Sequence, residues 1–195
     1  ELRISSVMRF PVAETLAIIR EKLPDAGLGI PYEIQLGADG AEGRVSWKMM
    51  YPTSLPKGLV LDREGLLHGT PTEPVQGRTM TILATDQAGG TDKHTFVLTV
   101  ARGRLVSVSL PPAFAGTEYH AELKSQHMAA PLHWRVVSGS LPRNLVLDGL
   151  TGVISGSPKK VGITPVSVEV TGANGQMDRR DLVVRVLPRQ LLRLE

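Results

Sequence analysis

The chain of 195 residues contains one pattern of landmark residues twice, at a nearly constant offset of 85 to 87 residues. The first copy runs from Leu23-Pro24 to Val100, and the second runs from Leu110-Pro111 to Val186. Such self-similarity identifies repeated folding units. We therefore predict two domains of one fold, at residues 15–101 and 102–187.

The segments outside the two copies are short. We expect residues 1–14 to be a linker or the tail of a preceding repeat, and residues 188–195 to be a C-terminal tail. The chain starts at Glu1 without a Met, which indicates a processed or excised fragment. The final Leu194-Glu195 resembles an expression-vector scar.

Apolar and polar residues alternate within each copy. The pattern is clear in residues 32–36, 79–84 and 96–100, and again in residues 166–170 and 182–186. A period of two predicts strands with one buried face. About 86 residues supply roughly seven such strands, so the fold class is all-β, with two tandem immunoglobulin-like or cadherin-like sandwiches.

Aromatic residues occupy equivalent places in the two copies. Trp47 and Trp134 fall in the middle of the predicted third strand, between apolar alternates. A buried indole can bridge two sheets, so we predict that both tryptophans, with Tyr32 and Tyr119, form the structural core. The segment 16–23 is expected to be the first strand of the first copy, although its apolar spacing also fits a helix.

The landmark string identifies a family resemblance. Each copy reads Trp, Leu-Pro-x-x-Leu-x-Leu-Asp, and then Gly-x-(Ile/Leu)-x-Gly-(Thr/Ser)-Pro, ending at Pro71 and Pro158. This string resembles the immunoglobulin-like repeat family that is related to the dystroglycan-type cadherin-like domain. The resemblance covers about residues 16–187. It implies spacers, adhesive modules or interaction platforms of surface proteins, but a fold alone does not give function.

The resemblance to cadherin-like domains implies calcium as a candidate cofactor. Calcium is bound by carboxylate and carbonyl oxygens. The first copy offers four acidic candidates, Asp62, Glu64, Asp86 and Asp92. The junction that follows reads Ala101-Arg102-Gly103-Arg104, whose arginines would repel a cation. We therefore expect solvated turn carboxylates and no cofactor, with calcium as the alternative.

Basic residues gather on the last strand of the second copy, where Arg179, Arg180 and Arg185 are candidates for contact with a polyanion or a partner. Residues 23–100 hold 6 Lys/Arg and 9 Asp/Glu, whereas residues 101–186 hold 10 and 6. Aromatic residues make up only 4% of the chain, so no nucleic-acid stacking platform is indicated.

Catalytic signals are absent from the sequence. There is no cysteine, which excludes disulfides, thiolate nucleophiles and Cys-type zinc sites. There is also no Gly-x-Ser-x-Gly elbow, His-Glu-x-x-His helix or phosphate-binding loop, so no catalytic residue is predicted.

The sequence favours a non-catalytic extracytoplasmic module of a larger cell-surface, outer membrane-associated or periplasmic protein. Its expected partner is a protein or a surface glycan, and it would meet a membrane only through the parent protein. The alternatives are an accessory domain pair of a secreted carbohydrate-active enzyme or protease, and an assembly component whose partner adds a strand. The short junction predicts a stiff rod with Gly103 as its hinge.

Overall fold

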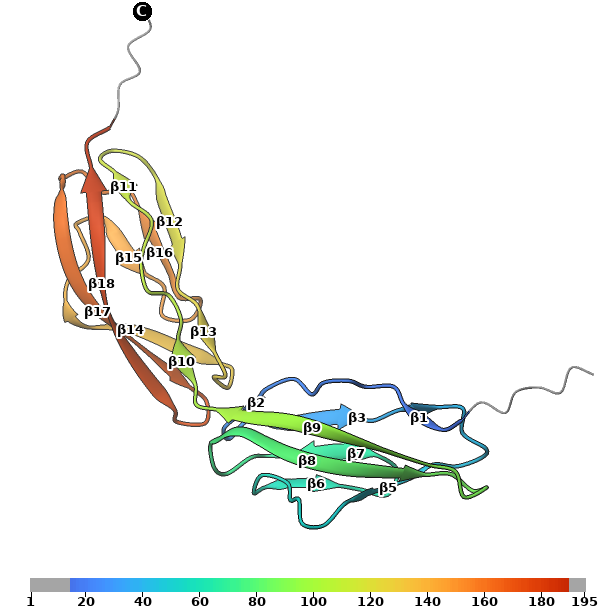
Figure 1. The fold of residues 1–195 in the computed structure, drawn as a ribbon. Helices are drawn as coiled ribbons and strands as arrows, with labels where there is room; N and C mark the ends of the chain where they lie inside the picture. The colour runs from blue at the N-terminus through green and yellow to red at the C-terminus, as the bar shows by residue number, and fades with distance from the viewer. Residues whose placement is uncertain (1–14, 190–195) are drawn as a thin grey trace, which may run out of the picture.

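The computed structural model describes residues 15–189, and these residues form strands and loops without a helix. Nothing in this part of the chain is therefore a helix long and apolar enough to cross a bilayer. The strands form two sandwiches that follow one another along the chain (Figure 1). The predicted all-β class and the tandem immunoglobulin-like architecture are confirmed.

The first sandwich packs a four-stranded sheet against a three-stranded sheet. The larger sheet has the order β2-β9-β8-β5, the smaller has β3-β7-β6, and β1 pairs with β4 beside them. The strands are β1 (Ala17–Ile18), β2 (Ala26–Gly27), β3 (Tyr32–Gln35), β4 (Ala38–Asp39), β5 (Ser46–Met49), β6 (Leu59–Leu61), β7 (Leu66–Gly69), β8 (Val75–Thr85) and β9 (Thr91–Ala101).

The second sandwich repeats this plan strand for strand. Its sheets have the orders β11-β18-β17-β14 and β12-β16-β15, with β10 paired to β13. The strands are β10 (Arg104–Leu105), β11 (Ala113–Phe114), β12 (Tyr119–Glu122), β13 (Ser125–Gln126), β14 (Leu132–Gly139), β15 (Leu145–Leu147), β16 (Val153–Gly156), β17 (Gly162–Gly172) and β18 (Met177–Leu187).

The segment expected to be one first strand is divided in the structure. Only β1 is a strand within residues 16–23, and it pairs antiparallel with β4. After Pro24 the chain joins the other sheet, where β2 pairs parallel with β9. Proline has no N–H to donate to a ladder, so the change of sheet falls at a natural break.

Each core is organised around its tryptophan. Trp47 on β5 is 5% exposed and Trp134 on β14 is 6% exposed. Tyr32 and Tyr119 are also buried, and each hydroxyl donates a hydrogen bond to the carbonyl of a proline eight residues earlier, at 3.0 and 2.9 Å. Burial raises the pKa of Tyr32 to about 12, despite the opposing charge of Arg20.

The two sandwiches meet at a bend (Figure 1), and the stiffness predicted for the pair from its short junction stays a prediction. The turn between β17 and β18 reaches the loop after β2, where the side-chain amides of Asn174 and Gln176 donate to the Leu28 carbonyl. Gln176 also accepts a hydrogen bond from the Gly103 N–H at 2.7 Å. The expected hinge is therefore held by the turn of the second sandwich.

We predict that Trp47→Ala destabilises the first sandwich by about 3–5 kcal/mol, because it empties a large aromatic site between the sheets. Urea unfolding followed by circular dichroism measures this loss, while the fluorescence of the remaining Trp134 reports the second sandwich. Tyr51→Ala is the control, since this side chain is 95% exposed and its loss should change stability by less than about 0.5 kcal/mol. A variant as stable as the parent would contradict the bridging role.

We also predict that Asn174→Ala combined with Gln176→Ala loosens the bend, because the variant removes four hydrogen bonds that tie the second sandwich to the first and to the junction. Small-angle X-ray scattering should fit a single bent shape for the parent and should require a broader distribution of dimensions for the variant. Identical profiles would show that the junction is held by other contacts.

Candidate functional site

The acidic candidates of the first copy act as acceptors for backbone amides. Asp86 follows β8 and is 9% exposed. Its carboxylate accepts hydrogen bonds from the Gly90 N–H at 2.7 Å and from the Glu42 N–H at 3.1 Å. Asp86 therefore closes the turn between β8 and β9 and fastens a neighbouring loop to it.

The other three candidates have comparable structural roles. Asp62 accepts from the Leu66 N–H at 2.8 Å, across the turn between β6 and β7. Asp92 accepts from the Ile18 N–H at 2.8 Å and so holds β1. Glu64 is an exposed residue of the same turn as Asp62.

The second copy repeats two of these acceptors. Asp178 accepts from the Leu105 N–H at 2.7 Å, as Asp92 does in the first copy. Asp148 accepts from the amides of Leu150 and Thr151 at 2.8 and 2.9 Å. Carboxylates that bind amides in both copies belong to the architecture of the repeat.

The four acidic candidates do not form one cluster within residues 15–189. Within residues 15–189 no three His, Asp or Glu side chains come together in a way that could hold a metal ion. Calcium needs six to eight oxygen ligands, and the carboxylates of Asp62, Asp86 and Asp92 already accept amide hydrogen bonds. The residues of the junction add arginines rather than further ligands.

The amide contacts also lower the pKa of two turn carboxylates. The hydrogen bond from the Glu42 amide is the main cause that holds the pKa of Asp86 below its ordinary value. The amides of Thr151 and Leu150 lower the pKa of Asp148 in the same way. A donor that binds the ionised form favours ionisation, so both groups are charged at neutral pH.

The three arginine candidates on β18 do not share one surface. Arg180 lies on the inward-facing side and donates to the Leu105 carbonyl at 3.2 Å. Arg179 and Arg185 are exposed and lie on the opposite face of the strand. In the register between β17 and β18, Arg179 lies opposite Glu169, whereas Arg185 lies opposite Ile163.

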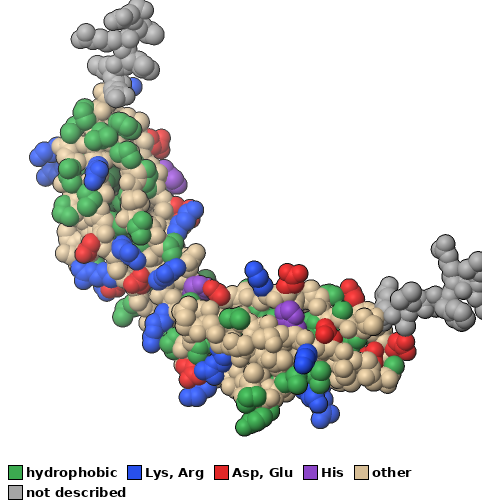
Figure 2. All heavy atoms as spheres, in the orientation of Figure 1, with side chains coloured by type: hydrophobic (Ala, Val, Ile, Leu, Met, Phe, Trp, Pro, Cys, Tyr) green, Lys and Arg blue, Asp and Glu red, His purple; other side chains and the backbone are tan. Residues whose placement is uncertain are grey.

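A groove at the far end of the second sandwich was not predicted from the sequence. It has a volume of about 390 Å³ and is lined by residues 140–143 and 160–164. We call it the distal groove, because it lies at the start of β17, opposite the turn that contacts Leu28. Figure 2 shows hydrophobic side chains interspersed with Lys and Arg over the part of the molecule that β17 and β18 form.

The lining of the distal groove combines charge with exposed apolar surface. Arg143 and Lys160 supply two cations, and Ser140 and Thr164 supply hydroxyls. Ile163 is 72% exposed and Val161 is 49% exposed. The sequence signal that could have found this site is a difference between the two copies, since the first copy has Glu73 where the second has Lys160.

Comparison with known families gives a match over both copies. The pattern of the family described as "Putative Ig domain" matches residues 19–101 and again residues 103–186. The "Serine-rich adhesin for platelets" of Staphylococcus aureus strain USA300 is 30% identical over 129 residues. That match covers 63% of this chain but only 6% of the adhesin.

Solved structures resemble the chain more distantly. Extracellular domains 3–5 of Drosophila OTK are 16% identical, with 90% of this chain and 63% of that chain covered and a TM-score of 0.42. An endo-fucoidan hydrolase of glycoside hydrolase family 107 is 19% identical, with 89% and 34% covered and a TM-score of 0.40. Likeness at this level supports no argument about function.

We predict that calcium leaves the stability of the pair unchanged, because its carboxylates are engaged by backbone amides. A ligand present at 100 times its dissociation constant would add about 2.7 kcal/mol, which a melting scan detects easily. The scan compares millimolar calcium with a chelator. A rise in melting temperature that Asp86→Ala removes, and that the exposed control Glu64→Ala preserves, would contradict this prediction.

Proposed function

Because the chain belongs to the immunoglobulin-like domain family whose pattern matches both of its repeats, we propose that it is a non-catalytic adhesion and spacer module of a larger extracytoplasmic protein. The observation that carries this proposal is the similarity to a bacterial adhesin. The match covers 63% of the chain, which is more than one repeat supplies. The similarity therefore extends to tandem sandwiches rather than to one isolated domain.

The chemistry of the side chains supports binding over catalysis. Four buried or half-buried carboxylates each accept a hydrogen bond from a backbone amide: Asp62, Asp86, Asp92 and Asp178. A general acid or base needs a carboxyl group that can reach a substrate proton, and these groups are committed to turns and first strands. The pair offers exposed surfaces instead, as an interaction module requires.

The bent junction supports the spacer part of the proposal. Only Arg102 and Gly103 separate β9 from β10, and the amide contacts at Leu28 hold the ends of the sandwiches together. A short, bonded connection positions a binding surface at a fixed distance from its attachment point, whereas a long Gly/Ser linker would not. The partner that we propose is a protein or a glycan on a surface outside the cytoplasm.

Beads coated with the pair should attach to cell surfaces more strongly than beads coated with a Trp47→Ala, Trp134→Ala variant that circular dichroism shows to be unfolded. Platelets belong in the panel of surfaces because the adhesin relative is named for them. Attachment counted under flow is the measurement. Equal attachment of the folded and unfolded proteins, or a hydrolytic activity that disappears when one carboxylate is mutated, would contradict the proposal.

A further inference from the structure

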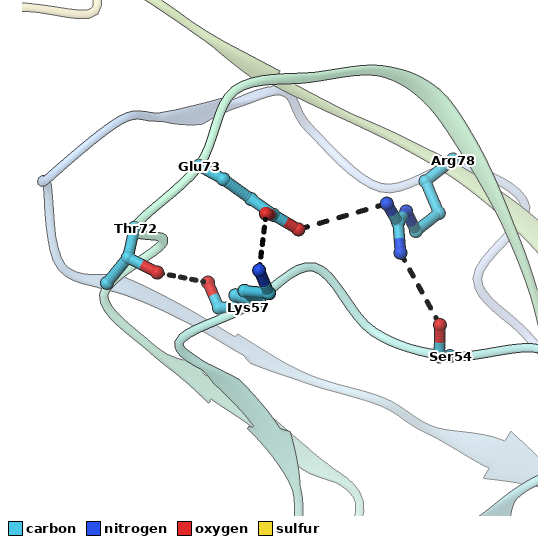
Figure 3. Close-up of polar contacts among 5 residues, drawn as sticks. All are labelled: Ser54, Lys57, Thr72, Glu73 and Arg78. Atoms are coloured by element: carbon cyan, nitrogen blue, oxygen red, sulfur yellow. Dashed lines mark hydrogen bonds and ion pairs between the residues drawn. The ribbon is translucent and has the colours of Figure 1, made fainter.

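The first sandwich contains its own carboxylate at the place that corresponds to the distal groove. Glu73 lies between two cations, 3.2 Å from Lys57 Nζ and 3.9 Å from an Arg78 guanidinium nitrogen (Figure 3). Arg78 also donates to the Ser54 hydroxyl at 3.4 Å, and Thr72 donates to the Lys57 carbonyl. These contacts join the loop before β6 to β8 and to the segment that leads into it.

The backbone fixes how the two copies correspond here. Gly58 and Asn144 both have positive φ angles, and their carbonyls accept from the amides of Thr70 and Ser157 respectively. Lys57 therefore corresponds to Arg143, and Glu73, three residues after Thr70, corresponds to Lys160. In the strand registers Arg78 lies opposite Leu98 and Thr164 lies opposite Val184, so these two residues also correspond.

The second copy thus keeps the cation at one wall of the groove and loses the carboxylate. Arg143 stands where Lys57 does, but Lys160 replaces Glu73, so two positive charges line the same groove. Neither forms an ion pair with any carboxylate of residues 15–189. Like charges at one site repel, and a carboxylate from outside would relieve that repulsion.

The backbone at this groove is also open on one side. β17 pairs with β18 from Gly162 onward, but its pairing with β14 begins only at Val166. Residues 162–164 therefore have a neighbouring strand on one side and the groove on the other. An extended peptide can add to such an edge through main-chain hydrogen bonds.

We propose that the distal groove binds an extended acidic segment of a partner polypeptide, whose carboxylate takes the place that Glu73 has in the first copy. Arg143 and Lys160 bind the carboxylate, with Ser140 and Thr164 as hydroxyl partners at the walls. Val161 and Ile163 contact the apolar side chains that alternate with the acidic ones along an extended chain. This inference rests on the proposed role of the pair as a binding module.

The lining favours a peptide over an anionic glycan. Leu141, Pro142, Val161 and Ile163 give the groove an aliphatic wall, and no aromatic ring lines it on which a sugar could stack. The unpaired segment of β17 offers main-chain groups to a peptide backbone. An acidic polypeptide matches the charge, the apolar wall and the strand edge together.

The test measures the fluorescence anisotropy of a short labelled peptide of alternating glutamate and valine, added to the intact pair. Lys160→Glu introduces the carboxylate of the first copy and should lower the affinity at least about tenfold, since it reverses a charge at the contact. Lys124→Glu makes the same charge change at an exposed position outside the groove and should leave the affinity within about twofold. The melting temperature of Lys160→Glu should match or exceed that of the parent, because the introduced carboxylate can pair with Arg143.

Two controls separate the alternatives. The same peptide with glutamine in place of glutamate should bind at least about tenfold more weakly, and equal binding would overturn the proposal. A heparin fragment is tested in the same way. If it binds more tightly than the peptide, and if Lys160→Glu weakens its binding, the proposal is overturned in favour of a glycan site. Failure of peptide binding while coated beads still attach to cells would sink the groove assignment and leave the adhesion role standing.

Discussion

The contact between a tryptophan and a glycine turn fixes the rest of each sandwich. Trp47 extends from β5 in the larger sheet, and Gly65 lies in the turn that joins β6 to β7 in the smaller one. A β-carbon on Gly65 would stand 2.6 Å from the indole nitrogen, so the ring occupies the space of the missing side chain. Gly65 also has a φ of 89°, which an L-residue with a side chain rarely adopts.

Backbone hydrogen bonds reinforce this contact in both copies. The backbone amides of Trp47 and Trp134 donate hydrogen bonds to the carbonyls of Arg63 and Gly149, which lie in the turns of the facing sheets, at 3.0 and 2.8 Å respectively. Gly152 holds Trp134 as Gly65 holds Trp47, with a positive φ and an equally close ring. With no disulfide available, this combination of ring burial and backbone pairing is what connects the two sheets of each domain.

The repeat, the strands and the two buried tryptophans were predicted from the sequence, because each depends on residue types that few others can replace, whereas the contact between each tryptophan and its glycine turn was not. Alternating apolar residues, a tryptophan and repeated glycines constrain the fold locally, and they recur at one offset. The bend could not be predicted, since it depends on Asn174 and Gln176 reaching a carbonyl about 150 residues away in the sequence. The distal groove was missed for the same reason, because its walls come from the loop before β15 and from the segment at the start of β17, about 20 residues later in the chain.

Residues that are the same in both copies explain the fold, so the residues that differ are the better guide to function. The turn of the second copy has Asn174 and Gln176, whereas the first copy has Ala88 and Gly90 at the matching positions. At the opposite end, Lys160 replaces Glu73.

These differences lie at the two ends of β17, whose 11 residues span about 33 Å at the usual rise of a strand. Because the near end is bonded to Leu28, the direction in which the distal groove faces follows from the junction. A partner bound there would therefore be held at a fixed orientation to the first sandwich, which is what a spacer with an aimed binding surface requires.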